Sequence, residues 1–160
     1  MKSENKQSGN KPGNKQTGST AAVSKPADRR PRRPGGSRKL TADVARAVRA
    51  ALDKKALDVV VLDLRGTPAF TDFFVLCSGT SQRQVKAIAD SVEEALRAAR
   101  VRPAHIEGYD RAEWILMDFF SFIVHVFTPQ TREFYSLERL WGDAERIEIS
   151  DQAAIGSQTD

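Results

Sequence analysis

Three segments of the chain have apolar residues at helical spacing and are predicted to form helices. The first begins at Thr41, which can cap it, and the second begins at a capping box formed by Ser81 and Gln84. The third has Pro129 in its first turn and ends at Gly142. Four residues of this last helix form an apolar side that is predicted to face the core: Phe134, Leu137, Leu140 and Trp141.

Five further segments are predicted to be strands. Continuous apolar runs at residues 59–62 and 73–77 are typical of strands that are buried on both faces. Alternating patterns at residues 114–119 and 122–128 predict a hairpin, and residues 105–107 form a short strand before it. Five strands and about three helices predict an α/β (α+β) fold, with one mixed sheet and helices packed on it.

The charge is divided unevenly along the chain. Residues 1–39 carry eleven Lys and Arg against two acidic residues, a net charge of +9, so that −5 remains for the rest of a chain whose formal net charge is +4. This segment has few apolar residues and is predicted to be a disordered basic tail. A single domain is predicted at residues 40–148, followed by a polar C-terminal tail at 149–160.

The basic tail contains a cluster that can contact phosphates loosely, formed by Arg29, Arg30, Arg32 and Arg33. A merely solubilising tail without a dedicated partner stays open. No run approaches the roughly 18 apolar residues of a membrane span. The start of the chain has no apolar leader region and no amphipathic stripe, so we expect neither secretion nor organellar import but a cytoplasmic protein.

The few Cys and His residues argue against metal and thiol chemistry. Cys77 is the one cysteine, which excludes an internal disulfide and a multi-cysteine metal site. It lies in an apolar strand, where a thiol is usually inert, although a nucleophilic pair with His105 stays open. His125 shares a strand face with apolar residues, which favours a hydrogen-bonded core histidine over a metal ligand. We expect no metal and no cofactor.

One loop raises the alternative of a phosphate- or nucleotide-binding enzyme of the nucleotidyltransferase type. Residues 79–83 lie between a strand and a helix N-terminus, where backbone N–H groups can hold a phosphate. Such enzymes need carboxylates two residues apart on a neighbouring strand to hold metal ions. Asp118 has no such partner, and the pair Asp143 and Glu145 is predicted to lie in a polar tail. A capped helix after a tight turn is therefore favoured over a catalytic site.

Two aromatic residues are predicted on polar faces. Trp114 shares a strand face with Asp118, and Tyr135 falls on the polar side of the last helix, near Arg132. Trp, Tyr and Arg are the residue types that dominate binding at protein interfaces. The other interpretation is a tryptophan half-buried under a loop.

Seven motifs resemble, in one order, those of the Iojap family, the ribosomal silencing factors, and together span about residues 41–146. The motifs are Asp58–Asp63, Thr71–Val75, Gly79–Gln84, Glu107-Gly108, Trp114–Asp118, Val124–Phe127 and Arg132–Trp141.

The resemblance implies a non-enzymatic factor that binds the large ribosomal subunit through large-subunit protein fourteen. It would block association with the small subunit and repress translation under nutrient limitation, as a monomer or homodimer off the ribosome. The family fold is similar to the nucleotidyltransferase fold without its catalytic carboxylates. The family's interface tryptophan matches Trp114 and its tyrosine matches Tyr135, while Asp118 and Arg132 belong to the same motifs. The basic tail could contact ribosomal RNA.

The chain departs from this family between the two hairpin strands. Phe120-Ser121 stands where many members have Gly-Asp, a pair suited to a turn with positive φ. The turn is therefore predicted either to be of another type or to expose Phe120 for contact.

Overall fold

The computed structural model of the protein describes residues 40–150. The elements in chain order are α1 (Ala42–Asp53), β1 (Leu57–Asp63), β2 (Phe73–Ser78), α2 (Gln82–Ala98), β3 (His105–Glu107), β4 (Trp114–Asp118), β5 (Phe122–Phe127), α3 (Pro129–Tyr135), α4 (Leu137–Leu140) and β6 (Glu145–Glu148). The predicted tail of residues 1–39 and the last ten residues lie outside this range.

A mixed six-stranded sheet forms the centre of the described region, with the strand order β3-β4-β5-β2-β1-β6. Only β2 and β5 pair in parallel, and the other neighbours are antiparallel. A parallel pair needs a long crossover connection, which α2, β3 and β4 supply. The parallel pair is buried along its whole length, which the continuous apolar run predicted for β2 and the alternating pattern did not predict for β5.

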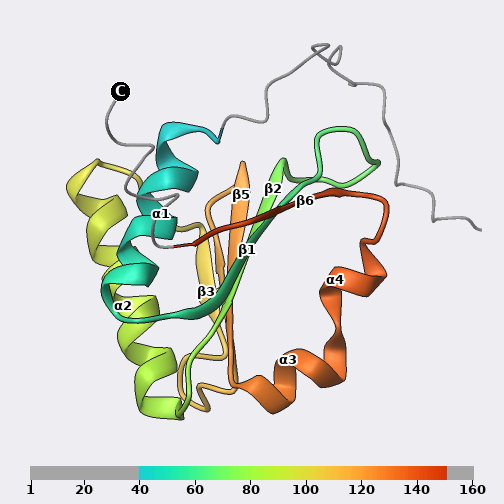
Figure 1. Ribbon diagram of the computed structural model, residues 1–160. Helices are drawn as coiled ribbons and strands as arrows, with labels where there is room; N and C mark the ends of the chain where they lie inside the picture. The colour runs from blue at the N-terminus through green and yellow to red at the C-terminus, as the bar shows by residue number, and fades with distance from the viewer. Residues whose placement is uncertain (1–39, 151–160) are drawn as a thin grey trace, which may run out of the picture. The chain divides into compact units, whose positions relative to one another are not determined.

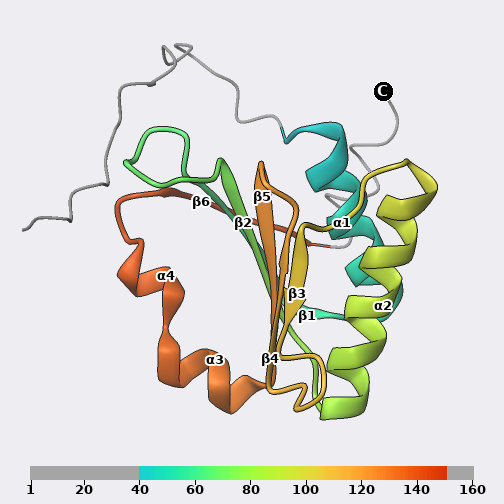
Figure 2. The same cartoon turned by 180° about the vertical axis from the view of Figure 1, so that it is seen from behind.

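Helices cover the two faces of the sheet unequally (Figures 1 and 2). On one face, α1 and α2 lie side by side over the larger core, into which Val44, Val75 and Ile88 project without exposed surface. The other face carries a smaller apolar cluster that includes Leu62, Phe74 and Leu76. The short α3 and α4 lie on this second face, and neither contains a buried residue.

The prediction of five strands omitted β6. Three of its four residues are charged, and Glu145 had been placed in a polar tail. In the structure β6 pairs antiparallel with β1 and forms an edge of the sheet. Charged side chains are common on edge strands because they discourage pairing with other chains. Ile147, the one apolar residue, packs against the larger core.

The predicted single last helix is also wrong, because it is broken into α3 and α4. Ser136 adopts a left-handed conformation with φ of 48° and separates the two. Two residues of the predicted apolar side do not face the core, since Phe134 is 78% exposed and Leu140 71% exposed. Leu137 and Trp141 keep the predicted orientation and pack against the smaller cluster.

Candidate protein-binding site

Strand alternation places Trp114 on the less covered face of the sheet. Residues 115 and 117 of β4 are fully buried under α1 and α2, whereas residues 114, 116 and 118 are half-buried on the opposite face. Trp114 and Asp118 therefore share a face, as the alternating pattern predicted. The indole packs against Phe127 of the neighbouring strand, with 5.1 Å between the ring centroids.

The end of α3 adds two further rings beside this tryptophan. The ring of Tyr135 lies 4.7 Å from that of Trp114, and the ring of Phe134 lies 4.9 Å from that of Tyr135, edge to face. Tyr135 is 49% exposed. We call Trp114, Phe134 and Tyr135 the aromatic surface. It joins the two predicted interface rings, which are 21 residues apart in the chain, and adds Phe134, which the helical pattern had assigned to the core.

A hydrogen bond fixes the orientation of Trp114. Its Nε1–H donates to Nδ1 of His125 over 3.1 Å. An indole nitrogen can only donate, so Nδ1 must be unprotonated and the hydrogen of the neutral imidazole lies on Nε2. His125 is the predicted hydrogen-bonded core histidine, although its Nε2 is buried without a partner among the described residues. Burial lowers the pKa of His125 to about 3.

We expect this histidine to make the fold sensitive to mild acid. Its pKa is lower in the folded chain than in the unfolded chain, where it is near 6.5, so its contribution is complete at neutral pH and is lost as the pH falls towards 3. Lowering the pH from 7 to 5 should cost about 2 kcal/mol of unfolding free energy from this group. Urea denaturation of the wild type and of His125→Asn at both pH values measures it.

The asparagine variant is the control because its amide oxygen can accept from Trp114 but does not titrate. Comparing the change with pH in each protein removes the variant's own effect on stability. An equal loss of stability in both proteins between pH 7 and pH 5 would contradict the assignment to His125.

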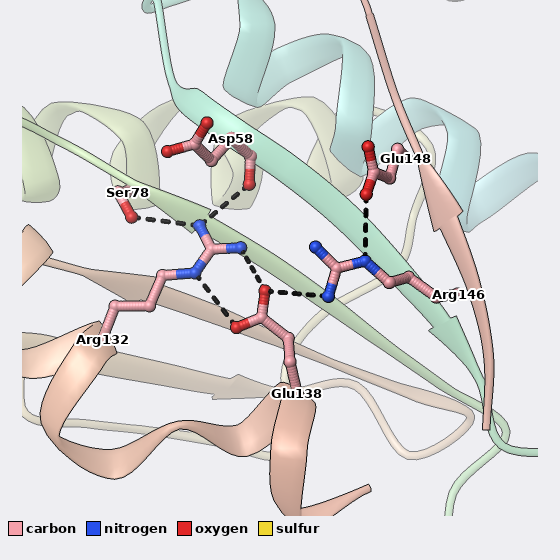
Figure 3. Close-up of polar contacts among 6 residues, drawn as sticks. All are labelled: Asp58, Ser78, Arg132, Glu138, Arg146 and Glu148. Atoms are coloured by element: carbon pink, nitrogen blue, oxygen red, sulfur yellow. Dashed lines mark hydrogen bonds and ion pairs between the residues drawn. The ribbon is translucent and has the colours of Figure 1, made fainter. Parts of the chain in front are cut away.

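Arg132 fastens α3 and α4 to the end of the sheet (Figure 3). Its Nη1 donates to the backbone oxygen of Asp58 over 2.8 Å and to Oγ of Ser78 over 3.0 Å. Its Nη2 donates to Glu138 of α4 over 2.8 Å, and Glu138 also forms an ion pair with Arg146 of β6 at 3.6 Å. Although burial opposes ionisation, the hydrogen bonds and charges of the two arginines keep the pKa of Glu138 below its usual value.

Only 12% of the Arg132 side chain is exposed, and its guanidinium is used within the chain. The predicted interface residue Arg132, three residues before Tyr135 in α3, therefore presents little of its own surface to a partner. Its two contacts with the sheet are made with Ser78 and Asp58, which precede it in the chain by 54 and 74 residues. No local sequence pattern could reveal contacts over such separations.

Asp118 lies at the far end of β4 and shapes the hairpin turn. Its Oδ1 accepts from the backbone N–H of Phe120 over 2.8 Å, and 23% of its side chain is exposed. Phe120 has φ of 74° and is 73% exposed. The N–H of Ser121 donates to the oxygen of Phe119 over 2.9 Å, so Phe120 is the central residue of a γ-turn. The predicted exposure of Phe120 is confirmed, but the expectation that phenylalanine would avoid a positive φ here is wrong, because Phe120 adopts one at the centre of the γ-turn.

The loop that suggested a phosphate site is used for internal contacts. The N–H of Gln84 donates to Oγ of Ser81 over 3.1 Å, and Oε1 of Gln84 accepts from the N–H of Thr80 over 2.6 Å. The Nε2 of Gln84 donates to the backbone oxygens of Lys54 and Lys55 at the end of α1. Ser81 therefore caps α2 as predicted, whereas the side chain of Gln84 accepts from the residue before the cap and also joins the two long helices.

The remaining predicted groups are apart from the aromatic surface. Cys77 is fully buried in the larger core, and burial raises the pKa of its thiol to about 12. β4 and β5 separate its strand from that of His105, so the two do not form a nucleophilic pair. Within residues 40–150, no group of three His, Cys, Asp or Glu could hold a metal ion. The predicted phosphate contacts Arg29, Arg30, Arg32 and Arg33 lie outside the described residues.

The described region is thus an α+β domain. Two long helices cover one face of its sheet, and exposed aromatic rings lie at the other face. Residues 37–160 match the model of a family described as ribosomal silencing factor during starvation. The chain belongs to this family of ribosomal silencing factors. The family names associate it with the ribosome and with repression of translation.

Individual proteins agree with this assignment. The ribosomal silencing factor RsfS of Halalkalibacterium halodurans is 42% identical over 103 residues, which are 64% of this chain and 88% of that protein. A crystal structure of a protein from Chromobacterium violaceum is similar with a TM-score of 0.61 and 36% identity, over 62% of this chain and 83% of that one. A mouse protein named mitochondrial assembly of ribosomal large subunit protein 1 is 33% identical over 102 residues, 62% of this chain and 45% of that protein.

No helix within residues 40–150 has the length and apolar character needed to cross a bilayer.

Proposed function

We propose that this chain silences ribosomes by binding the large subunit through large-subunit protein fourteen, with the aromatic surface as the contact. The bound factor then occupies space that the small subunit needs, and translation falls when nutrients are scarce. The observation that carries this proposal is the contact between the half-buried ring of Trp114 and the exposed ring of Tyr135 at the less covered face of the sheet. Membership of the silencing-factor family supports the ribosome as the target.

The geometry of these rings suits a protein partner. Aromatic side chains supply large contact areas, and Trp and Tyr are enriched among the residues that dominate binding energy. Trp114 is fixed by its bond to His125, and Tyr135 packs against Trp114. Side chains that are already ordered lose less conformational entropy when a partner binds.

The charge of the described region outside its two long helices favours a basic partner. Outside residues 41–55 and 81–102, the described residues include five Lys and Arg against twelve Asp and Glu. Complementary charge speeds the encounter of two proteins and disfavours wrong partners. Ribosomal proteins are basic because they bind RNA, so an acidic surface suits them. Asp118 is proposed as a contact at the edge of the site. Arg132 is proposed as the residue that holds α3, and with it Tyr135, in position.

Silencing by obstruction needs binding and placement but no reactive group, so we propose that the factor is not an enzyme. Its place of action is then wherever bacterial ribosomes are, the cytoplasm. The arginines of the basic tail, Arg29 to Arg33, are proposed to contact phosphates of nearby ribosomal RNA.

A pull-down from a bacterial extract tests the proposal. The tagged full-length chain should retain large subunits and large-subunit protein fourteen, without small subunits. Added to purified subunits, it should lower the fraction of joined ribosomes in a sucrose gradient. Retention of both subunits in equal amounts, or an unchanged joined fraction with the factor bound, would contradict the proposed obstruction.

A further inference from the structure

A basic surface lies on the side of the sheet opposite the aromatic surface. It is formed by α1 and α2 with the turns that follow them, residues 41–55 and 81–102, which we call the helical layer (Figure 2). The helical layer contains nine Lys and Arg against five Asp and Glu. The described region is thus divided into a basic layer and an acidic remainder, and the overall net charge of the domain hides this division.

The cations of the helical layer are mostly unpaired. Six of them are exposed and form no ion pair with another described residue: Arg49, Lys54, Lys55, Arg83, Arg100 and Arg102. Outside the layer the opposite holds, because four of the five arginines form ion pairs: Arg65, Arg111, Arg132 and Arg146. The unpaired positive charge of the described region is therefore concentrated on one surface.

The structure holds part of this surface rigidly. Gln84 donates to the backbone oxygens of both Lys54 and Lys55, over 3.0 and 3.1 Å, and so fixes the end of α1 against the start of α2. Arg83 is the neighbour of Gln84 in the same first turn of α2. Arg100 follows the other end of this 17-residue helix, about 25 Å away along its axis. The cations thus extend along the helical layer and can meet several phosphates of one strand.

We propose that the helical layer is a second binding surface, whose partner is the sugar–phosphate backbone of RNA. Unpaired, exposed Lys and Arg that contact phosphates provide affinity that depends mainly on charge and not on sequence. A membrane would require exposed large apolar side chains among the cations. Every residue of the helical layer is described, and none of its large apolar side chains is exposed. This proposal does not depend on the contact with large-subunit protein fourteen.

The test measures how RNA binding depends on salt. The full-length Lys54→Gln/Arg83→Gln variant is compared with Arg111→Gln/Arg139→Gln, which removes the same charge from the acidic remainder. Each protein is titrated into a 20-base-pair RNA duplex of mixed sequence at several salt concentrations. A lost phosphate contact lowers the slope of log affinity against log salt by about one. We expect a slope smaller by about 2 for the first variant and unchanged for the second.

The basic tail is present in all three proteins, so its contribution is the same in each. Equal slopes for the two variants would overturn the proposal. In a second arm, each protein is mixed with anionic vesicles containing phosphatidylglycerol. If the Lys54→Gln/Arg83→Gln variant loses vesicle binding but binds RNA as the wild type does, the surface is assigned to membranes instead. Binding to isolated large-subunit protein fourteen is measured alongside and should be unchanged in the Lys54→Gln/Arg83→Gln variant, which separates this result from the proposed docking.

Discussion

Replacement of Tyr135 by alanine is expected to weaken binding to large-subunit protein fourteen by about 2 kcal/mol or more, roughly a 30-fold loss of affinity. The ring is 49% exposed and belongs to a helix without buried residues, so the free energy of unfolding should change little. The ring nevertheless lies against Trp114 in the middle of the aromatic surface. Calorimetric titration of the purified ribosomal protein measures the affinity, and urea denaturation measures the stability.

Phe70→Ala is the matched control. Phe70 is 81% exposed, but it lies in the loop between β1 and β2 and not in the aromatic surface, so its removal should leave affinity unchanged. Trp114→Ala is a less specific probe because it also removes the bond to His125 and the packing on Phe127. Equal affinities for the wild type and Tyr135→Ala would refute the assigned binding surface.

The sequence predicted the features that depend on short-range patterns. Alternation along β4 was sufficient to place Trp114 on the same face as Asp118, because side chains of a strand point alternately to its two faces. Continuous apolar runs were sufficient to identify β1 and β2 as buried strands, whereas β5, predicted from an alternating pattern, proved to be buried along its whole length. The cap at Ser81 also formed as predicted, since Ser81 and Gln84 are only three residues apart, although the side chain of Gln84 bonds to Thr80 and not to Ser81.

Features that depend on distant partners could not be predicted in the same way. β6 exists because β1 offers an edge, although its own residues are mostly charged. The exposure of Phe134 follows from the break at Ser136, and an apolar residue at helical spacing gives no sign of such a break. Positive φ at a serine is uncommon, and no glycine marked the position. The two halves of the segment are instead joined by Arg132 and Glu138.

This junction leads to the second large expected effect. Arg132→Met should lower the free energy of unfolding by about 3 kcal/mol, because two sheet acceptors lose their donor and the half-buried Glu138 keeps only its ion pair with Arg146. Methionine retains the length and apolar stem of the side chain but not the guanidinium. Urea denaturation measures the loss, and hydrogen exchange at the backbone amides of α3 and α4 should become faster.

Arg139→Met is the control in the same segment. Its side chain is exposed and forms no ion pair with another described residue, so we expect a change within about 0.5 kcal/mol. Arg132→Lys should be intermediate, because an ammonium cannot donate to Glu138 and the sheet in the same forked geometry. If Arg132→Met reduces binding to large-subunit protein fourteen without loss of stability, Arg132 contacts the partner directly. If it reduces both, together with faster exchange in α3, Arg132 acts by holding Tyr135 in place, which is the result that the geometry of the junction leads us to expect.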